Sequence, residues 1–123
     1  MFGKRLLSFK YAIQGIVLLI RTQANAQIHC VAAFLVLLLS IFFQISVTEW
    51  CLVVLCITSV LSAEAMNTAL EFLTDLVSPD YHTLAGKAKD VAAAAVLLSA
   101  IGSFIVGAII FLPKIYTFAI SEL

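Results

Sequence analysis

The sequence predicts an all-α integral membrane protein, in which an N-terminal amphipathic surface helix precedes three transmembrane helices. Of the 123 residues, 63% are hydrophobic and only 11% are charged, and the mean hydropathy is +1.15. Because soluble domains carry about 25% charged residues, this composition excludes a water-soluble globule. The formal net charge is zero, so the chain also lacks the basic surface that nucleic-acid binding requires.

Charge-free stretches define the predicted spans. No charged residue occurs within 22–48 or 91–113, and the apolar run 50–63 continues in a helical pattern through Glu64. A bilayer core takes about 20 helical residues, so the middle span must include Glu64. We expect transmembrane helices at 28–47, 49–76 and 91–112. The whole chain, 1–123, is then a single membrane domain.

Residues 1–27 are predicted to form a helix in the membrane surface. Apolar side chains recur there at steps of three and four residues, with the bases and Gln14 between them. A cleaved signal peptide is the competing interpretation, because residues 24–26 resemble a cleavage site. Gln14 interrupts the apolar stretch and Arg21 separates it from that site, which favours the surface helix.

The positions of the bases predict the orientation. Six of the seven lie before the first span or between the second and third: Lys4, Arg5, Lys10, Arg21, Lys87 and Lys89. Cytoplasmic segments carry the excess of Lys and Arg. We therefore expect the N-terminus and the 77–90 loop in the cytoplasm.

A stripe of polar residues on the second span marks the candidate functional site. Glu64, Asn67, Glu71 and Asp75 follow one another at steps of three, four and four residues. In a helix they share one face over about 16 Å. Ionisable groups within a span are costly and by default indicate function.

The stripe has three possible roles. It could be a structural seam between helices, although four acceptor-rich groups without a base repel one another. Gathered carboxylates favour a hard cation such as Mg²⁺. Cation transport is a competing interpretation, but three helices offer little for alternating access.

The segment after the stripe predicts a phosphate site. Ser78 and Pro79 end the helix, and Lys87 and Lys89 open the next one. Lysines that face a carboxylate stripe suggest a phosphate bridged by Mg²⁺, whereas ordinary positive flanking would explain the lysines but not Asp90. The chain contains no Walker motif and no kinase glycine-rich loop.

The pattern E-x-x-N-[ST]-A-x-E-x-x-x-D over 64–75, followed by A-K-D at 88–90, resembles the prokaryotic diacylglycerol kinase family of small trimeric membrane lipid kinases. The stretch S-P-D-Y-H-T-L-A-G-K-A-K-D-V-A-A at 78–93 is most similar to the undecaprenol kinase branch. The resemblance covers nearly the whole chain. It implies ATP- and Mg²⁺-dependent phosphorylation of a membrane lipid hydroxyl, undecaprenol or diacylglycerol, by a homotrimer in the bacterial inner membrane.

The resemblance also implies roles for individual residues. Glu64 falls on the catalytic base and also contacts the lipid, Glu71 falls on a Mg²⁺ ligand, and Ala93 falls near the lipid substrate. Asn67 and Asp75 match other polar residues of the site. The ATP-contacting positions, with Glu71, are Lys4, Tyr11, Gln23, Asp80, Tyr81, His82, Lys89 and Asp90.

The chain departs from the family at Gln23. The family has a second metal-binding Glu 41 residues before the catalytic one, and that position is Gln23 here. An amide oxygen can coordinate Mg²⁺ but supplies no charge, so the affinity for a second ion should fall. The alternative to an active kinase is therefore a degenerate kinase or a non-catalytic cation-binding helix bundle.

Overall fold

The computed structural model describes residues 2–122 and consists, over that range, of four α-helices without a β-strand. The helices are α1 (Phe2–Thr22), α2 (Ala24–Phe42), α3 (Val47–Val77) and α4 (Thr83–Ser121). Helices α2, α3 and α4 are each long and apolar enough to cross a membrane. The structure therefore confirms the predicted all-α class with three helices that could span a membrane.

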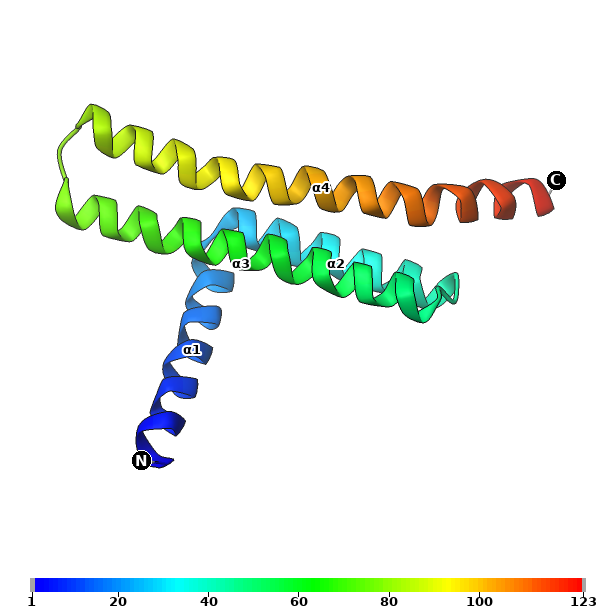
Figure 1. The fold of residues 1–123 in the computed structure, drawn as a ribbon, viewed down its shortest axis with the longest axis horizontal. Helices are drawn as coiled ribbons and strands as arrows, with labels where there is room; N and C mark the ends of the chain where they lie inside the picture. The colour runs from blue at the N-terminus through cyan, green and yellow to red at the C-terminus, as the bar shows by residue number, and fades with distance from the viewer. Residues whose placement is uncertain (1, 123) are drawn as a thin grey trace.

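Helices α3 and α4 form a long antiparallel pair, with α2 alongside α3 (Figure 1). We call the end where residues 78–82 join this pair the loop end, and the end where residues 43–46 join α2 to α3 the turn end. Three polar contacts link α3 to α4, from the loop end to the turn end: the Asp75–Lys89 ion pair, a 3.3 Å hydrogen bond from Ser103 Oγ to the Cys56 carbonyl, and a 2.8 Å ion pair between Lys114 Nζ and Glu49 Oε1. These contacts fix the register along the whole pair.

Helix α1 leaves the other three at a steep angle (Figure 1). Leu19 is the one buried residue of α1, and its other large apolar side chains are exposed. The helix ends at Thr22, and Gln23 has an extended backbone at the start of α2. The break thus comes earlier than the predicted boundary after residue 27. Location of α1 in a membrane surface stays a prediction.

The predicted end of the first span at residue 47 was wrong, because α2 ends at Phe42. Gln44 adopts a left-handed conformation with φ 48°, and the Ile45 N–H donates to the Ser40 carbonyl over 3.2 Å. This geometry closes helix C-termini, but glycine or asparagine usually occupies the left-handed position. A glutamine there gives no sequence signal for the helix end.

The start of α3 is a capping box that the sequence analysis did not use. The Glu49 N–H donates to Ser46 Oγ, and the Ser46 N–H donates to Glu49 Oε2 over 2.8 Å. The S-x-x-E spacing is a recognisable start signal. It moves the start of the helix to Val47, two residues before the prediction.

Helix α4 extends past the predicted span, 91–112, at both ends. It runs through Pro113, whose ring removes one backbone donor and normally kinks or ends a helix. Packing holds the continuation in place, because the Phe118 ring lies 5.5 Å from that of Phe42 and 6.3 Å from that of Phe43. The apolar core also lies at the turn end, where Ile45, Val53, Ile110 and Phe111 are buried together.

Candidate functional site

The polar stripe on α3 passes from buried to exposed toward the loop end. Glu64 is 2% exposed and Asn67 is 6% exposed, whereas Glu71 is half-buried and Asp75 is exposed. The helical spacing places the four on one face, and packing of the neighbouring helices covers its first half. The stripe therefore has a buried end at Glu64, which we call the shielded end, and a solvent-exposed end at Asp75.

The residues of the stripe interact with one another and with α4. Asn67 Nδ2 donates to Glu71 Oε1 over 3.2 Å. Asp75 forms an ion pair with Lys89, which also donates a hydrogen bond to it. One of the two lysines expected to face the stripe, Lys89, therefore pairs with its exposed end. Glu64 and Glu71 have no Lys or Arg partner within the described residues.

Three buried side-chain oxygens near the shielded end have no hydrogen-bond partner among residues 2–122. They are Glu64 Oε2, Asn67 Oδ1 and Thr68 Oγ1. Buried polar groups are nearly always paired, so such a cluster calls for an external partner. Thr68 was missed by the sequence analysis, although its position four residues after Glu64 was a usable signal.

The connection between α3 and α4 is exposed. Tyr81 is 90% exposed, and Asp80 is also accessible. His82 caps α4, because its Nδ1 accepts a 3.1 Å hydrogen bond from the Leu84 N–H. These predicted nucleotide-contacting residues lie at the same end of the molecule as Asp75 and Lys89 (Figure 1).

The other predicted site residues make no hydrogen bond or ion pair with the stripe within residues 2–122. Lys4 and Tyr11 are exposed on α1, which projects sideways from the other three helices (Figure 1). Gln23 Nε2 donates to Thr22 Oγ1 over 3.0 Å and makes no described bond with Glu71. Asp90 and Ala93 are exposed at the start of α4.

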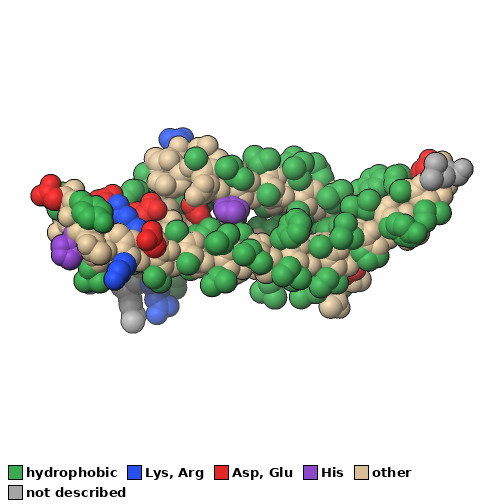
Figure 2. Space-filling model, turned by 90° about the horizontal axis from the view of Figure 1, so that it is seen from above, with side chains coloured by type: hydrophobic (Ala, Val, Ile, Leu, Met, Phe, Trp, Pro, Cys, Tyr) green, Lys and Arg blue, Asp and Glu red, His purple; other side chains and the backbone are tan. Residues whose placement is uncertain are grey.

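Charged side chains gather at the loop end, whereas hydrophobic ones cover most of the rest of the face shown in Figure 2. Within residues 2–122, no three His, Cys, Asp or Glu side chains lie close enough to hold a metal ion by themselves. Mg²⁺, however, usually keeps several waters and binds one or two carboxylates together with substrate phosphates. Glu71 and the unpaired Asn67 oxygen fit that kind of donor set.

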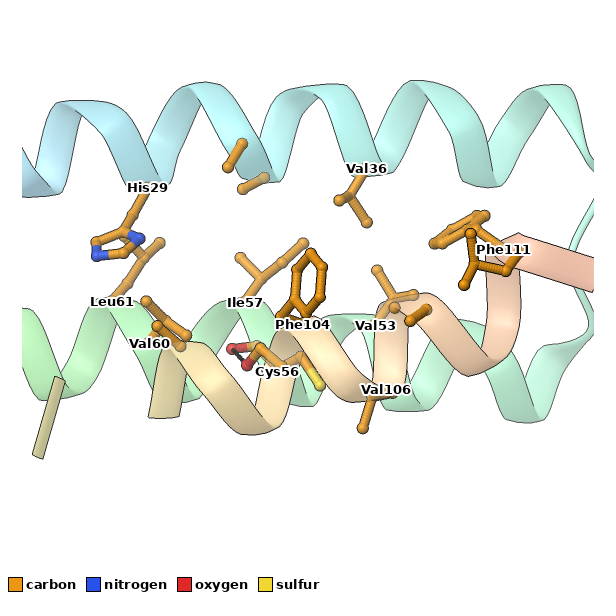
Figure 3. Close-up of a pocket in the computed structure, with 17 residues that line it drawn as sticks. His29, Val36, Val53, Cys56, Ile57, Val60, Leu61, Phe104, Val106 and Phe111 are labelled. Atoms are coloured by element: carbon orange, nitrogen blue, oxygen red, sulfur yellow. Dashed lines mark hydrogen bonds between the residues drawn. The ribbon is translucent and has the colours of Figure 1, made fainter. Parts of the chain in front are cut away.

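An apolar groove of about 470 Å³ runs between α2, α3 and α4. Figure 3 shows His29 beside Leu61 and Val60 at one end of the groove and Phe111 at the other. Glu64 follows Leu61 by three residues and Val60 by four, which is one helical turn along α3. The groove thus begins one turn from the buried carboxylate and runs toward the turn end.

Comparison with known proteins gives consistent matches. Residues 10–111 match the family model described as prokaryotic diacylglycerol kinase. Undecaprenol kinase from Bacillus subtilis (strain 168) is 43% identical over 108 residues, which cover 88% of each chain. Diacylglycerol kinase from Synechocystis sp. is 39% identical over 89% of this chain and 63% of its own length. Diacylglycerol kinase from Escherichia coli (strain K12) is 31% identical over 58% of each chain.

Proposed function

This chain belongs to the prokaryotic diacylglycerol kinase family, a family of lipid kinases, and we propose that it transfers the γ-phosphoryl group of ATP to the hydroxyl of a membrane lipid. The observation that carries the proposal is Glu64, a carboxylate within an apolar helix that is 2% exposed and has an oxygen without a partner. Placing an ionisable group there costs free energy, so such a group by default indicates a functional site.

Glu64 is proposed as the general base. Its Oε2 accepts the proton of the lipid hydroxyl, the hydroxyl oxygen forms a bond to the γ-phosphorus, and the bond from that phosphorus to the β–γ bridging oxygen breaks. The products are the lipid phosphate and ADP, and the proton remains on Glu64 until solvent removes it. Such a base contributes roughly 100- to 10,000-fold to the rate.

Glu71 is proposed as a Mg²⁺ ligand, with Asn67 fixed beside it by the 3.2 Å hydrogen bond. When bound, Mg²⁺ would neutralise charge on the ATP phosphates, which is most of what phosphoryl transfer asks of a protein. Lys89 would bind a phosphate oxygen after leaving its exposed partner Asp75. Asp80, Tyr81, His82 and Asp90 are close enough in the chain to complete a nucleotide site at the loop end.

The residues on α1 require a second copy of the chain in this proposal. Lys4 and Tyr11 lie on α1, which projects sideways from the other helices, and Gln23 makes no hydrogen bond with the stripe within residues 2–122, so a neighbouring subunit would present them to it. Ala93 and Ala94 on α4 are exposed, and small residues let helices approach closely. Both observations support the homotrimer with shared sites that the family resemblance implies.

Undecaprenol is the proposed lipid, with diacylglycerol as the competing substrate. The relative that is 43% identical over 88% of both chains is named undecaprenol kinase. The apolar groove that begins one turn from Glu64 is proposed to hold the hydrocarbon chain. The prokaryotic family supports a bacterial inner membrane, and the distribution of the bases supports an orientation with the N-terminus and the loop end at the cytoplasmic face, where ATP is available.

The test is phosphate transfer from labelled ATP with Mg²⁺ to undecaprenol and to diacylglycerol in mixed micelles. Glu64→Gln should lower turnover by roughly 100- to 10,000-fold and leave ATP affinity largely unchanged. Glu122→Gln, the same change at an exposed residue beyond α4, is the matched control. Near-normal turnover of Glu64→Gln would show that the base is another group. Absence of product on both lipids, from folded protein, would contradict the kinase proposal.

A further inference from the structure

Thr68 differs in the use of its hydroxyl from the four other threonines that lie beyond the first turn of their helix. Thr22, Thr58, Thr74 and Thr117 each donate to the backbone carbonyl four residues earlier, over 2.6–2.9 Å. Thr68 is 5% exposed, and its Oγ1 has no hydrogen-bond partner among residues 2–122. A helical threonine that does not bond back to its own helix retains a donor for another group.

The hydroxyl of Thr68 lies one helical turn from Glu64. Side chains four residues apart share a helix face, with about 5–6 Å between their Cβ atoms. Glu64 Oε2 is likewise buried and has no hydrogen-bond partner in the described part of the chain. The face therefore carries a donor and an acceptor at a spacing that one small polar group can bridge, since O–H···O bonds are about 2.7–2.8 Å long.

An alcohol has the complementary hydrogen-bond pattern. Its O–H donates one bond, and its oxygen accepts up to two. A hydroxyl placed between the two side chains would donate to Glu64 Oε2 and accept from Thr68 Oγ1. A phosphate monoester would instead bring its negative charge against the Glu64 carboxylate. The pair thus favours an unphosphorylated alcohol over its phosphorylated product.

We propose that Thr68 is a substrate-binding residue, whose Oγ1–H donates to the hydroxyl oxygen of the lipid alcohol while Glu64 accepts the proton of that hydroxyl. This inference rests on the proposed lipid kinase function. In the transfer step Thr68 keeps its own proton. The lipid hydroxyl gives its proton to Glu64 as its oxygen forms the bond to phosphorus. The role of Thr68 is to hold the alcohol oxygen in line for attack and to select for an alcohol.

The experiment measures lipid phosphorylation by the full chain in mixed micelles for wild type, Thr68→Val, Thr68→Ser and Thr58→Val. Valine replaces the hydroxyl by a methyl group of similar size, and serine retains the hydroxyl. Thr58 is the matched control, because it lies on the same helix, is exposed and has its hydroxyl bonded to the Val54 carbonyl over 2.9 Å. Undecane, a hydrocarbon without a hydroxyl, serves as the competing ligand.

We expect Thr68→Val to lower kcat/KM for the lipid alcohol about tenfold, mainly through a higher KM, with KM for ATP unchanged. Thr68→Ser and Thr58→Val should stay within about threefold of wild type. Inhibition by undecane should be the same in wild type and Thr68→Val. The thermal midpoint of Thr68→Val should be unchanged or higher, since a buried hydroxyl without a partner is replaced by an apolar group.

Three results would overturn the inference. Wild-type kinetics in Thr68→Val, or equal losses in the valine and serine variants, would show that the hydroxyl does not bind substrate. A lower kcat with an unchanged lipid KM would assign Thr68 to holding Glu64 instead. If only the role of Thr68 is wrong, wild type still phosphorylates lipid and Glu64→Gln does not. If wild type itself phosphorylates no lipid, the proposed kinase function is wrong as well.

Discussion

The two ends of α3 treat their polar groups in opposite ways. At the turn end, Glu49 accepts from the Ser46 N–H and from Lys114, both over 2.8 Å, beside a packed apolar core. Toward the loop end, Glu64, Asn67 and Thr68 are buried with oxygens that have no hydrogen-bond partner among residues 2–122. Because buried polar groups are normally satisfied, the first arrangement is typical of a structural contact and the second of a site that awaits a ligand.

The sharpest test of this contrast makes the same chemical change at both ends of the helix. Glu71→Gln should lower lipid kinase turnover roughly 100-fold, by weakening Mg²⁺ binding. Its thermal midpoint should be unchanged, because the glutamine oxygen can still accept from Asn67. Kinase assays with a Mg²⁺ titration, together with thermal unfolding, measure both quantities.

Glu49→Gln is the matched partner of that variant and should do the reverse. It removes the charge that pairs with Lys114, so the thermal midpoint should fall by a few degrees. Turnover per folded protein should stay within about twofold of wild type, since Glu49 lies far along α3 from Glu64. Loss of activity in Glu49→Gln would contradict a purely structural role for the turn end. Full activity in Glu71→Gln would contradict a functional role for the stripe.

A further prediction tests whether the hydrocarbon chain of the lipid lies in the groove that runs from near Glu64 toward the turn end. Gly107 lines the groove, and a Cβ atom added there would meet no atom within 4 Å. Gly107→Leu should therefore place a side chain at the groove and lower kcat/KM for undecaprenol roughly tenfold, with KM for ATP unchanged. Gly102→Leu is the control, because Gly102 is on the same helix, has equal space and does not line the groove. Equal effects of the two variants would place the lipid chain elsewhere.

The smallest expected effect concerns the missing carboxylate before the first span. Gln23→Glu should lower the Mg²⁺ concentration for half-maximal activity about threefold, because a carboxylate adds charge where an amide has none. Gln14→Glu, the same change at an exposed position on α1, should leave the Mg²⁺ dependence unchanged. A Mg²⁺ titration that is identical for Gln23→Glu and wild type would exclude Gln23 from the metal site.

Much of the architecture was predictable because it depends on local patterns. The charge-free runs identified three apolar helices, and the steps between Glu64 and Asp75 placed four polar residues on one face. The family was also predicted correctly, because its motif is contiguous on α3 and at the start of α4. The end of α2 was mispredicted because Gln44 takes a backbone conformation that its side chain does not favour.

The candidate site was predictable only as a set of residues on helix faces. The sequence showed that Glu64 and Thr68 are one turn apart, but their burial and lack of partners follow from how the other helices pack on α3. The ion pair between Asp75 and Lys89 joins residues that are 14 positions apart through the register of α3 against α4. Whether Gln23, Lys4 and Tyr11 reach a site stays a prediction.

The sequence by itself determined the membrane class, the helical segments and the polar stripe, because hydropathy and the 3.6-residue period act over a few turns of chain. Only the tertiary structure decided which polar groups are satisfied. Lys114 reaches Glu49 and Lys89 reaches Asp75 because α4 runs the full length of α3, and the same packing buries Glu64 without giving its Oε2 a partner. Contacts between helices depend on their relative register, which no local pattern encodes.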